Sequence, residues 1–306
     1  MSVSADLSRH AIPGQLEFRV HDSGLVFAVI DNPLARAEIC LQGGHLTTWS
    51  PKDQAEPVIW LSDRATFAPG KSIRGGVPVC WPWFGPHGRE AGYPGHGFAR
   101  TVPWEVVASA VLPGGETELR LRLVGNETSR MQWPHPCELE LVARVGTTLT
   151  IDLATRNQGG AAFRIGEALH TYFHIGDIAD IRIHGLDGAS YVDKVDGGAR
   201  KRQAGAIICA GEVDRVYLDT AADCVIEDAR LARCIRIAKQ GSQSTVVWTP
   251  GQDKAEKMGD FGPGRAGQGG WREMVCVESG NALDNGVEVP AGGEHILRVQ
   301  YSVEKQ

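Results

Sequence analysis

Polar and apolar residues alternate in many short runs along this chain, and long amphipathic helical patterns are scarce. In Leu119–Leu123 and Ile235–Ile237, aliphatic residues at every second position are separated by arginines. Such period-two runs, bounded by glycine, proline, asparagine or aspartate, are typical of half-buried antiparallel strands. The pattern therefore predicts an all-β protein, a large antiparallel β-sandwich with few short helices. The same alternation occurs in Leu16–Val20, Leu149–Leu153, Ile181–Ile183 and Ile296–Tyr301.

Two stretches lack this alternation. Residues 62–100 are irregular and rich in glycine, proline and aromatic side chains, and residues 251–270 are rich in glycine and charged side chains. We expect both to be long loops, which in compact β domains often carry function. No linker and no repeat of fixed period divides the chain, so residues 1–306 are predicted to form one domain.

The composition narrows the possible partners. The chain has 306 residues, of which 42% are hydrophobic and 22% charged, and its net charge is -6. Because it has no global basic field, we do not expect it to bind nucleic acid, and any site for an anion must be local. No heptad pattern forces assembly, so a monomer is expected.

The cysteines and apolar runs indicate the compartment. The seven cysteines are scattered and form no C-x-x-C motif, which disfavours a disulfide framework or a zinc ribbon and favours reducing surroundings. The first residues lack the basic and apolar regions of a signal peptide. No apolar run approaches the length of about 18 residues that suggests a membrane span. We therefore expect a cytoplasmic protein without membrane contact.

A histidine interrupts the otherwise apolar segment Glu167–His174, which has the character of a buried strand. Side chains two residues apart share a face of a strand, so His170, Tyr172 and His174 should lie on one side. His170 and His174 would be roughly 13 Å apart at ~3.3 Å per residue, which is too far to share one ion and disfavours a metal site. His170 is then either a hydrogen-bonded core histidine or a catalytic group.

A carboxylate interrupts a second apolar segment, Val275–Asn281. Glu278 is expected to be half-buried at a strand end, or to lie in a turn. Half-burial would raise its pKa towards neutrality, which suits a general base. If Glu278 and His170 lay on neighbouring strands and shared a cleft, they would form a general acid/base pair without a metal or a covalent nucleophile.

Cationic residues lie among glycines in two segments, Lys71–Pro78 and His96–Arg100. The guanidinium groups of Arg74 and Arg100 match the geometry of a phosphate, and glycines let backbone N–H groups approach an anion. The pattern favours anion binding, with solvated surface charge as the alternative.

Two further features have open interpretations. The aromatics of Trp81–Phe84 could form a platform for a sugar ring or belong to the core. Asp214 could accept hydrogen bonds from sugar hydroxyls, or it could pair with Arg215.

Taken in order, five segments resemble the glucose-6-phosphate 1-epimerase family, the hexose-phosphate branch of the aldose 1-epimerases or mutarotases. The resemblance extends from about Gly43 to Asn281. The five segments are Lys71–Pro78, His96–Arg100, Ala168–Phe173, Val213–Tyr217 and Val277–Asn281.

The resemblance implies a β-sandwich of the galactose-mutarotase type that interconverts the α and β anomers of a hexose 6-phosphate without a cofactor or metal. Glu278 would take the proton of the anomeric hydroxyl, and His170 would protonate the ring oxygen. The residues expected to bind the phosphorylated sugar are Arg74, Arg100, Asp214, Lys71 and His96.

One departure from the family pattern leaves the preferred hexose open, because Gly95 stands where the family often has glutamine. Three alternatives from other classes also remain. The chain could be a non-catalytic carbohydrate-binding protein on the same fold, a glycosidase that uses Asp214 and Glu278, or a regulatory protein that has kept the site.

Overall fold

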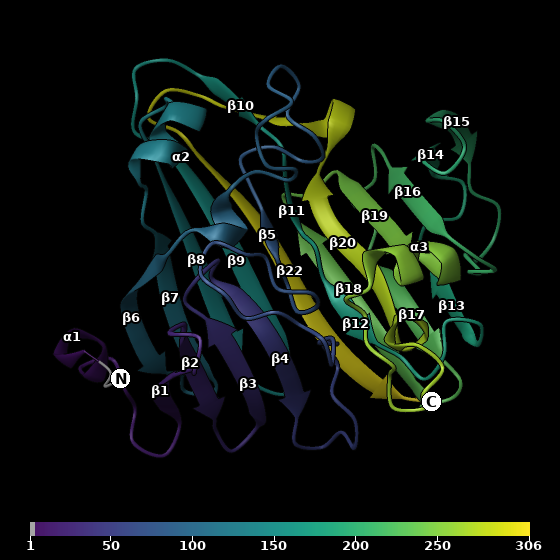
Figure 1. Cartoon of the computed structure of the whole chain (residues 1–306), viewed down its shortest axis with the longest axis horizontal. Coiled ribbons are helices and arrows are strands. Elements are labelled where there is room, and N and C mark those ends of the chain that lie inside the picture. The colour runs from purple at the N-terminus through teal and green to yellow at the C-terminus, as the bar shows by residue number, and fades with distance from the viewer. Residues whose placement is uncertain (1–3) are drawn as a thin grey trace.

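The computed structural model describes residues 4–306, and antiparallel strands make up most of its regular structure (Figure 1). Eight strands form what we call the back sheet, in the spatial order β13-β17-β18-β22-β9-β8-β7-β6. Their bounds are β6 Trp104–Val111, β7 Thr117–Leu123, β8 Cys137–Val145, β9 Leu149–Asn157, β13 Ile181–His184, β17 Cys224–Asp228, β18 Arg233–Gln240 and β22 Glu294–Lys305.

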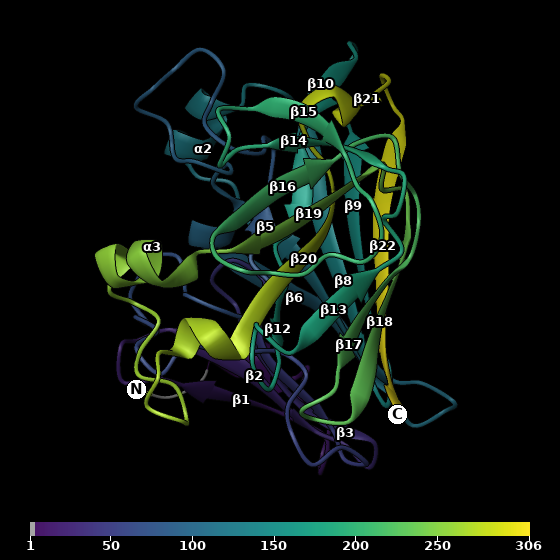
Figure 2. The ribbon, with the colours of Figure 1, turned by 90° about the vertical axis from the view of Figure 1, so that its right-hand side faces the viewer.

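Eight further strands form the front sheet, in the order β15-β14-β16-β19-β20-β11-β5, with β12 also paired to β20. Figure 2 shows β14, β16, β19 and β20 crossing in front of the layer that contains β9 and β22. Their bounds are β5 Val79–Cys80, β11 Glu167–Leu169, β12 Tyr172–His174, β14 Ser190–Asp193, β15 Ala199–Arg202, β16 Val213–Tyr217, β19 Ser244–Thr249 and β20 Met274–Asn281.

The remaining strands form two smaller sheets. The N-terminal sheet contains β1 Leu16–Val20, β2 Val26–Asp31, β3 Ala35–Cys40 and β4 His45–Pro51 in that order. Its buried residues, including Ile30, Ile39 and Trp49, join the hydrophobic core between the two large sheets. The second small sheet pairs β10 Phe163–Ile165 with β21 Val287–Val289.

The helices are few and short, as the sequence pattern predicts. They are α1 Ala5–Ser8, α2 Glu127–Gln132 and α3 Gly251–Met258, with 3-10 turns at Ala99–Thr101, Gly270–Glu273 and Leu283–Asn285. None of the helices among residues 4–306 is long and apolar enough to cross a membrane.

The strand predictions are confirmed, and one loop prediction is partly wrong. All six alternating runs lie inside strands, and residues 62–100 contain only β5 and one 3-10 turn. The expected loop over residues 251–270 begins instead with α3, because Ala255 packs into an apolar cluster with Trp248 and Phe261. Gly259 ends this helix in the left-handed conformation that favours glycine.

The two faces of the front sheet have different surroundings. Val247 and Val277 belong to the main core that the sheet shares with the back sheet. Neighbouring positions point the opposite way by strand alternation, and there the register pairs Val246 with Glu278 and Asp214 with Trp248. This second face of the front sheet carries Asp214 and Glu278, two of the polar residues that the sequence singles out.

Candidate active site

A cavity of about 320 Å³ opens on the face of the front sheet that is turned away from the core. Residues of β16, β19 and β20 line it, together with side chains from residues 72–100 and from α3. One flanking apolar cluster contains Trp248 and Phe261, and another contains Val216 with Phe84 packed against it. A cavity of this volume suits one small ligand.

Strand register makes His170 and Glu278 face each other. β11 and β12 both pair with β20, and the pairs on either side of His170 share one register, Leu169 with Ser279 and Tyr172 with Cys276. This register places His170 opposite Glu278, and side chains in that relation lie about 5 Å apart at their Cβ atoms. The Nε2 atom of His170 is 3.4 Å from the Oε1 atom of Glu278.

Both residues occupy backbone positions that differ from the expected ones. His170 lies in a two-residue break between β11 and β12, where its amide donates to the Pro78 carbonyl at 3.0 Å. Glu278 lies inside β20 rather than at a strand end or in a turn, and its side chain is only 1% exposed. The carboxyl group is therefore more deeply buried than expected.

Burial favours the neutral form of each group. It is the main cause that raises the pKa of Glu278 well above 4.5, and the Asp214 carboxylate acts in the same direction. Burial also lowers the pKa of His170 well below 6.5, and nearby cationic groups add to this effect. Burial in the pocket thus favours a carboxylic acid and a neutral imidazole, whereas the sequence suggests a carboxylate and an imidazolium.

The pocket contains four cationic side chains, of which two form ion pairs with carboxylates. Arg74 donates to the Asp260 carboxylate at 3.0 Å and to the Tyr172 hydroxyl at 2.8 Å, and Lys254 pairs with Glu212 outside the pocket. Within residues 4–306, no carboxylate lies within ion-pair distance of the other two, Arg100 and Lys194. These two cations are available to an anionic ligand.

The structure brings most of the other sequence-predicted residues into the same pocket. Asp214 lines it from β16, and burial raises the pKa of its carboxyl. It makes no ion pair with Arg215, whose guanidinium lies 5.0 Å from the Tyr191 ring centre. His96 also lines the pocket, and burial is the main cause that lowers its pKa to about 3.

Lys71 is the exception. Its side chain is exposed and does not line the pocket, and its backbone carbonyl accepts a hydrogen bond from Gln42 at 2.9 Å. The sequence pattern predicts that Gly75 and Gly76 let backbone N–H groups approach an anion. In the structure they instead allow close packing within the protein. The Gly76 amide donates to the Trp60 carbonyl at 2.7 Å, and a Cβ at Gly75 would lie 2.7 Å from that same oxygen.

Sequence reasoning missed several pocket residues. Lys194 follows β14 in a turn, and its amide donates to the Asp214 carbonyl at 2.9 Å, which fixes it beside β16. Its ammonium group lies 5.2 Å from the ring centre of Phe84, another pocket residue. The aromatic residues of Trp81–Phe84 therefore have two locations. Trp81 and Trp83 are buried in the core, while Phe84 lines the pocket. No sequence motif near Lys194 indicates that its side chain lies in the pocket.

Cys276 lies beside His170 and Glu278. Its thiol, His170 and Glu278 offer donor atoms within 4.8 Å of one another. A metal requires deprotonated ligands, but burial raises the pKa of the Cys276 thiol well above 9.0. A metal would bind to this group only by displacing the thiol proton.

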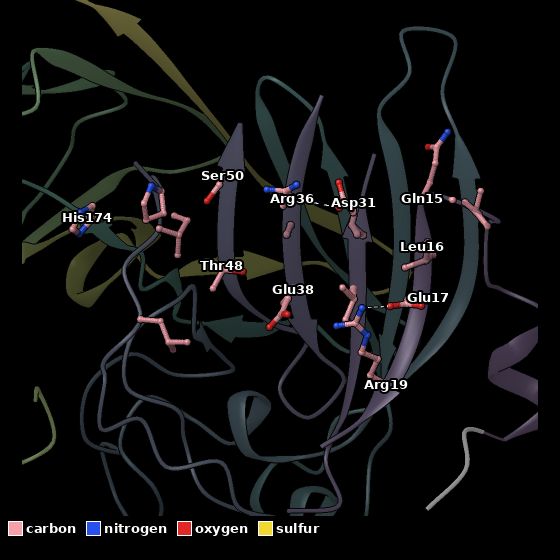
Figure 3. Close-up of a pocket in the computed structure, with 18 of the residues that line it drawn as sticks. Gln15, Leu16, Glu17, Arg19, Asp31, Arg36, Glu38, Thr48, Ser50 and His174 are labelled. Carbon is pink, nitrogen blue, oxygen red and sulfur yellow. Dashed lines mark hydrogen bonds and ion pairs between the residues drawn. The ribbon is translucent and has the colours of Figure 1, made fainter. Parts of the chain in front are cut away.

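A larger cavity, about 1050 Å³ in volume, lies over the N-terminal sheet (Figure 3). Two of its arginines pair with carboxylates of the same cavity, Arg36 with Asp31 at 3.2 Å and Arg19 with Glu17. His174 lines this cavity while His170 lines the smaller one, so the two histidines serve different cavities. None of the site residues predicted from the sequence lines the larger cavity.

Comparisons with known proteins agree on one family. A family model described as aldose 1-epimerase matches residues 27–302. The chain is 39% identical to an Escherichia coli protein named "Putative glucose-6-phosphate 1-epimerase", covering 84% of this chain and 83% of that protein. It is 34% identical to a protein of the same name from Cenchrus ciliaris, covering 87% and 80%.

Solved structures agree with this assignment. A crystal structure of a "putative mutarotase" from Salmonella typhimurium superposes with a TM-score of 0.88 at 34% identity, covering 97% of this chain and 96% of that one. A galactose mutarotase-like protein from Clostridium acetobutylicum, at 11% identity and a TM-score of 0.71, shares the fold. This chain therefore has the galactose-mutarotase type of β-sandwich and belongs to the aldose 1-epimerase family, enzymes that invert a sugar at its anomeric carbon.

Proposed function

We propose that this enzyme interconverts the α and β anomers of a hexose 6-phosphate, with glucose 6-phosphate as the first candidate. One observation carries the proposal: the His170 and Glu278 side chains face each other in a pocket that also holds two cations without carboxylate partners. The facing pair suits proton transfer, and the cations suit a phosphate. The names of the relatives point to the same substrate.

The pair holds one transferable proton in either protonation state. As carboxylate and imidazolium, Glu278 accepts the proton of the anomeric hydroxyl and His170 gives a proton to the ring oxygen. As carboxylic acid and imidazole, the two roles are exchanged. Burial favours the second state in the pocket, and both states provide one donor and one acceptor.

Anomer exchange uses this pair twice. Ring opening breaks the C1–O5 bond to give the aldehyde, C1 then rotates about C1–C2, and reclosure on the other face reverses both proton transfers. Each positioned proton transfer contributes about 10²–10⁴-fold, so the two together supply about 5–11 kcal/mol of barrier reduction. The substrate's own hemiacetal supplies the electrophile, so the proposed reaction needs no cofactor.

Binding at the phosphate end leaves C1 free to rotate. Arg100 and Lys194 are the cations that lack carboxylate partners, and we propose that they bind the phosphate together with Arg74. Because Lys71 lies outside the pocket, we propose that Lys194 contacts the phosphate in place of Lys71. Asp214 would accept hydrogen bonds from sugar hydroxyls.

The test is a coupled anomerisation assay on freshly dissolved glucose 6-phosphate and on free glucose. His170→Ala and Glu278→Ala should each lower kcat by about 10²–10⁴-fold while the protein stays folded. The exposed pair of His184 and Glu227, 2.8 Å apart and outside the pocket, offers matched controls. His184→Ala and Glu227→Ala should keep full activity.

The same assay tests the phosphate contacts. Lys194→Met and Arg100→Ala should raise KM for glucose 6-phosphate about tenfold or more, with little change for free glucose. Wild-type kcat in the Glu278→Ala variant would contradict the mechanism. If the wild-type protein does not raise the rate of anomer exchange above the uncatalysed rate, the result would instead favour a non-catalytic sugar-binding protein.

A further inference from the structure

The His170 imidazole has an unusual environment for an acid/base group. Its Nδ1 atom is buried and has no hydrogen-bond partner within residues 4–306. Its Nε2 atom faces the Glu278 Oε1 atom at 3.4 Å, where it must meet the sugar. Functional histidines are commonly oriented by a hydrogen bond to the second ring nitrogen. Here some other contact must set the plane of the ring.

Aromatic rings supply that contact. The Tyr172 ring is stacked on the His170 ring, with centres 5.0 Å apart and planes 11° from parallel. Trp248 and His96 approach at 6.0 and 5.9 Å with their planes steeply inclined to the imidazole. Tyr172 is the parallel neighbour in this group, so its ring restrains rotation of the imidazole most directly.

Tyr172 is itself held firmly. Its side chain is buried in the cluster that contains Trp248, and Trp60 also stacks on it at 5.9 Å. Its hydroxyl accepts a hydrogen bond from Arg74 Nη1 at 2.8 Å, and Asp260 accepts one from Arg74 Nε at 3.0 Å. One side chain, Tyr172, therefore joins a pocket cation to the His170 ring.

We infer that Tyr172 is a positioning residue for the proposed reaction: its ring sets the plane of the His170 imidazole, and its hydroxyl fixes that plane relative to Arg74. The inference deepens the proposed function and depends on it. Tyr172 need not touch the reacting atoms for this role. Its two parts are separable, because phenylalanine keeps the ring and loses the hydroxyl, whereas leucine loses the ring.

The test compares Tyr172→Phe and Tyr172→Leu with glucose 6-phosphate as substrate and inorganic phosphate as competitor. Tyr172→Leu should lower kcat by about tenfold to a hundredfold, because a misplaced acid/base group loses rate steeply. Tyr172→Phe should keep kcat close to wild type and raise KM and the inhibition constant of phosphate, because Arg74 loses one contact. The ¹⁵N resonances of the His170 ring should move in Tyr172→Leu and stay in Tyr172→Phe.

A matched control separates positioning from general loss of packing. Tyr191 is a buried tyrosine outside the pocket with an arginine 5.0 Å from its ring centre. Tyr191→Leu should destabilise the fold without changing kcat. If Tyr172→Leu does not fold, Tyr172→Met fills the volume without a flat ring and should show the same loss of kcat.

Two results would overturn the inference. One is a wild-type kcat in a folded Tyr172→Leu or Tyr172→Met variant, and the other is an equal loss of kcat in Tyr172→Phe. Failure of the proposed function has a different signature, because the wild-type enzyme would then leave the anomerisation of glucose 6-phosphate unchanged.

Discussion

Glu278 is a carboxyl group in surroundings that disfavour charge. Its side chain is 1% exposed, and its Oε2 atom is buried without a hydrogen-bond partner among residues 4–306. Its pKa is therefore raised well above 4.5, with burial as the largest cause. A buried carboxyl group with a raised pKa is typical of functional sites, and it is costly to the fold.

A stability prediction follows from the sign of that pKa shift. Above about pH 4.5 the unfolded chain releases the Glu278 proton while the folded protein keeps it. Wild-type stability therefore falls as pH rises towards the raised folded pKa. Glu278→Gln removes this dependence, so its gain in unfolding free energy over wild type should grow with pH, by at most about 1.4 kcal/mol per pH unit.

Urea unfolding of wild type and Glu278→Gln at pH 5, 6, 7 and 8 measures this difference. A gain that stays flat or shrinks as pH rises would show that the carboxyl group is ionised in the folded protein. The Glu288→Gln variant, at an exposed position of β21, is the control and should show no such trend.

At the residue scale, sequence reasoning reaches only part of the site. His170 and Glu278 stand out because each polar group interrupts an apolar run. Lys194 does not, since a lysine in a turn between strands has the character of solvated surface, and only the hydrogen bond to the Asp214 carbonyl places it at the pocket. Lys71 shows the converse error, because its motif resembles an anion site while its side chain lies outside the pocket.

At the element scale, the pairing of β11 with β20 decides whether the acid/base pair can form. Gly280 lies opposite Ala168 in this pairing. A Cβ atom at Gly280 would be 2.5 Å from the Glu167 carbonyl oxygen and 2.8 Å from the Ala168 Cβ atom. Both obstacles belong to β11, two or three residues before His170. Any side chain at Gly280 must push this strand away from β20.

We therefore expect Gly280→Ala to reduce both stability and activity. Overpacking of this kind costs about 1–3 kcal/mol, and displacement of His170 should lower kcat about tenfold to a hundredfold. Thermal unfolding and the anomerisation assay measure the two effects. Gly211→Ala is the control, because a Cβ there meets no atom within 4 Å. A Gly280→Ala variant with unchanged kcat would show that the pairing tolerates a shift without moving His170.

Elements differ in how well the sequence predicts them. β1, β7 and β13 follow from alternation, because one face of each is buried and the other is not. β20 has buried side chains at every position, so alternation is lost and Glu278 resembles a strand end. The sequence of α3 is mostly polar, and its placement depends on Ala255 packing against residues that are close only in the fold.

At the scale of the whole molecule, the sequence pattern predicts the sandwich but not the face of the sheet that holds the site. That choice depends on which layer covers which face. The core face of the front sheet is covered by the back sheet, so the pocket opens on the other face, beneath residues 72–100 and α3. A single sequence contains no local signal for this arrangement, because it arises from contacts between segments far apart in the chain.

The N-terminal, front and back sheets share one hydrophobic core. This shared core is relevant to the prediction that residues 1–306 form one domain. Buried hydrogen bonds also cross between layers: Trp81 Nε1 donates to the Thr155 hydroxyl at 3.0 Å, and the Thr171 and Tyr301 hydroxyls lie 2.6 Å apart. Separate unfolding of one sheet would expose part of this core, so we predict one cooperative unfolding transition for residues 4–306.

Urea titrations followed by far-UV dichroism, tryptophan fluorescence and enzyme activity should therefore coincide. Tyr301→Phe removes one bond between the layers and should lower the free energy of unfolding by about 1 kcal/mol, since the Thr171 hydroxyl can still donate to the Leu169 carbonyl. The transition should move without splitting, because the lost bond belongs to a core that unfolds as a unit. Activity lost at a lower urea concentration than the far-UV signal would mean that the site-bearing layer unfolds alone, and that the chain contains more than one folding unit.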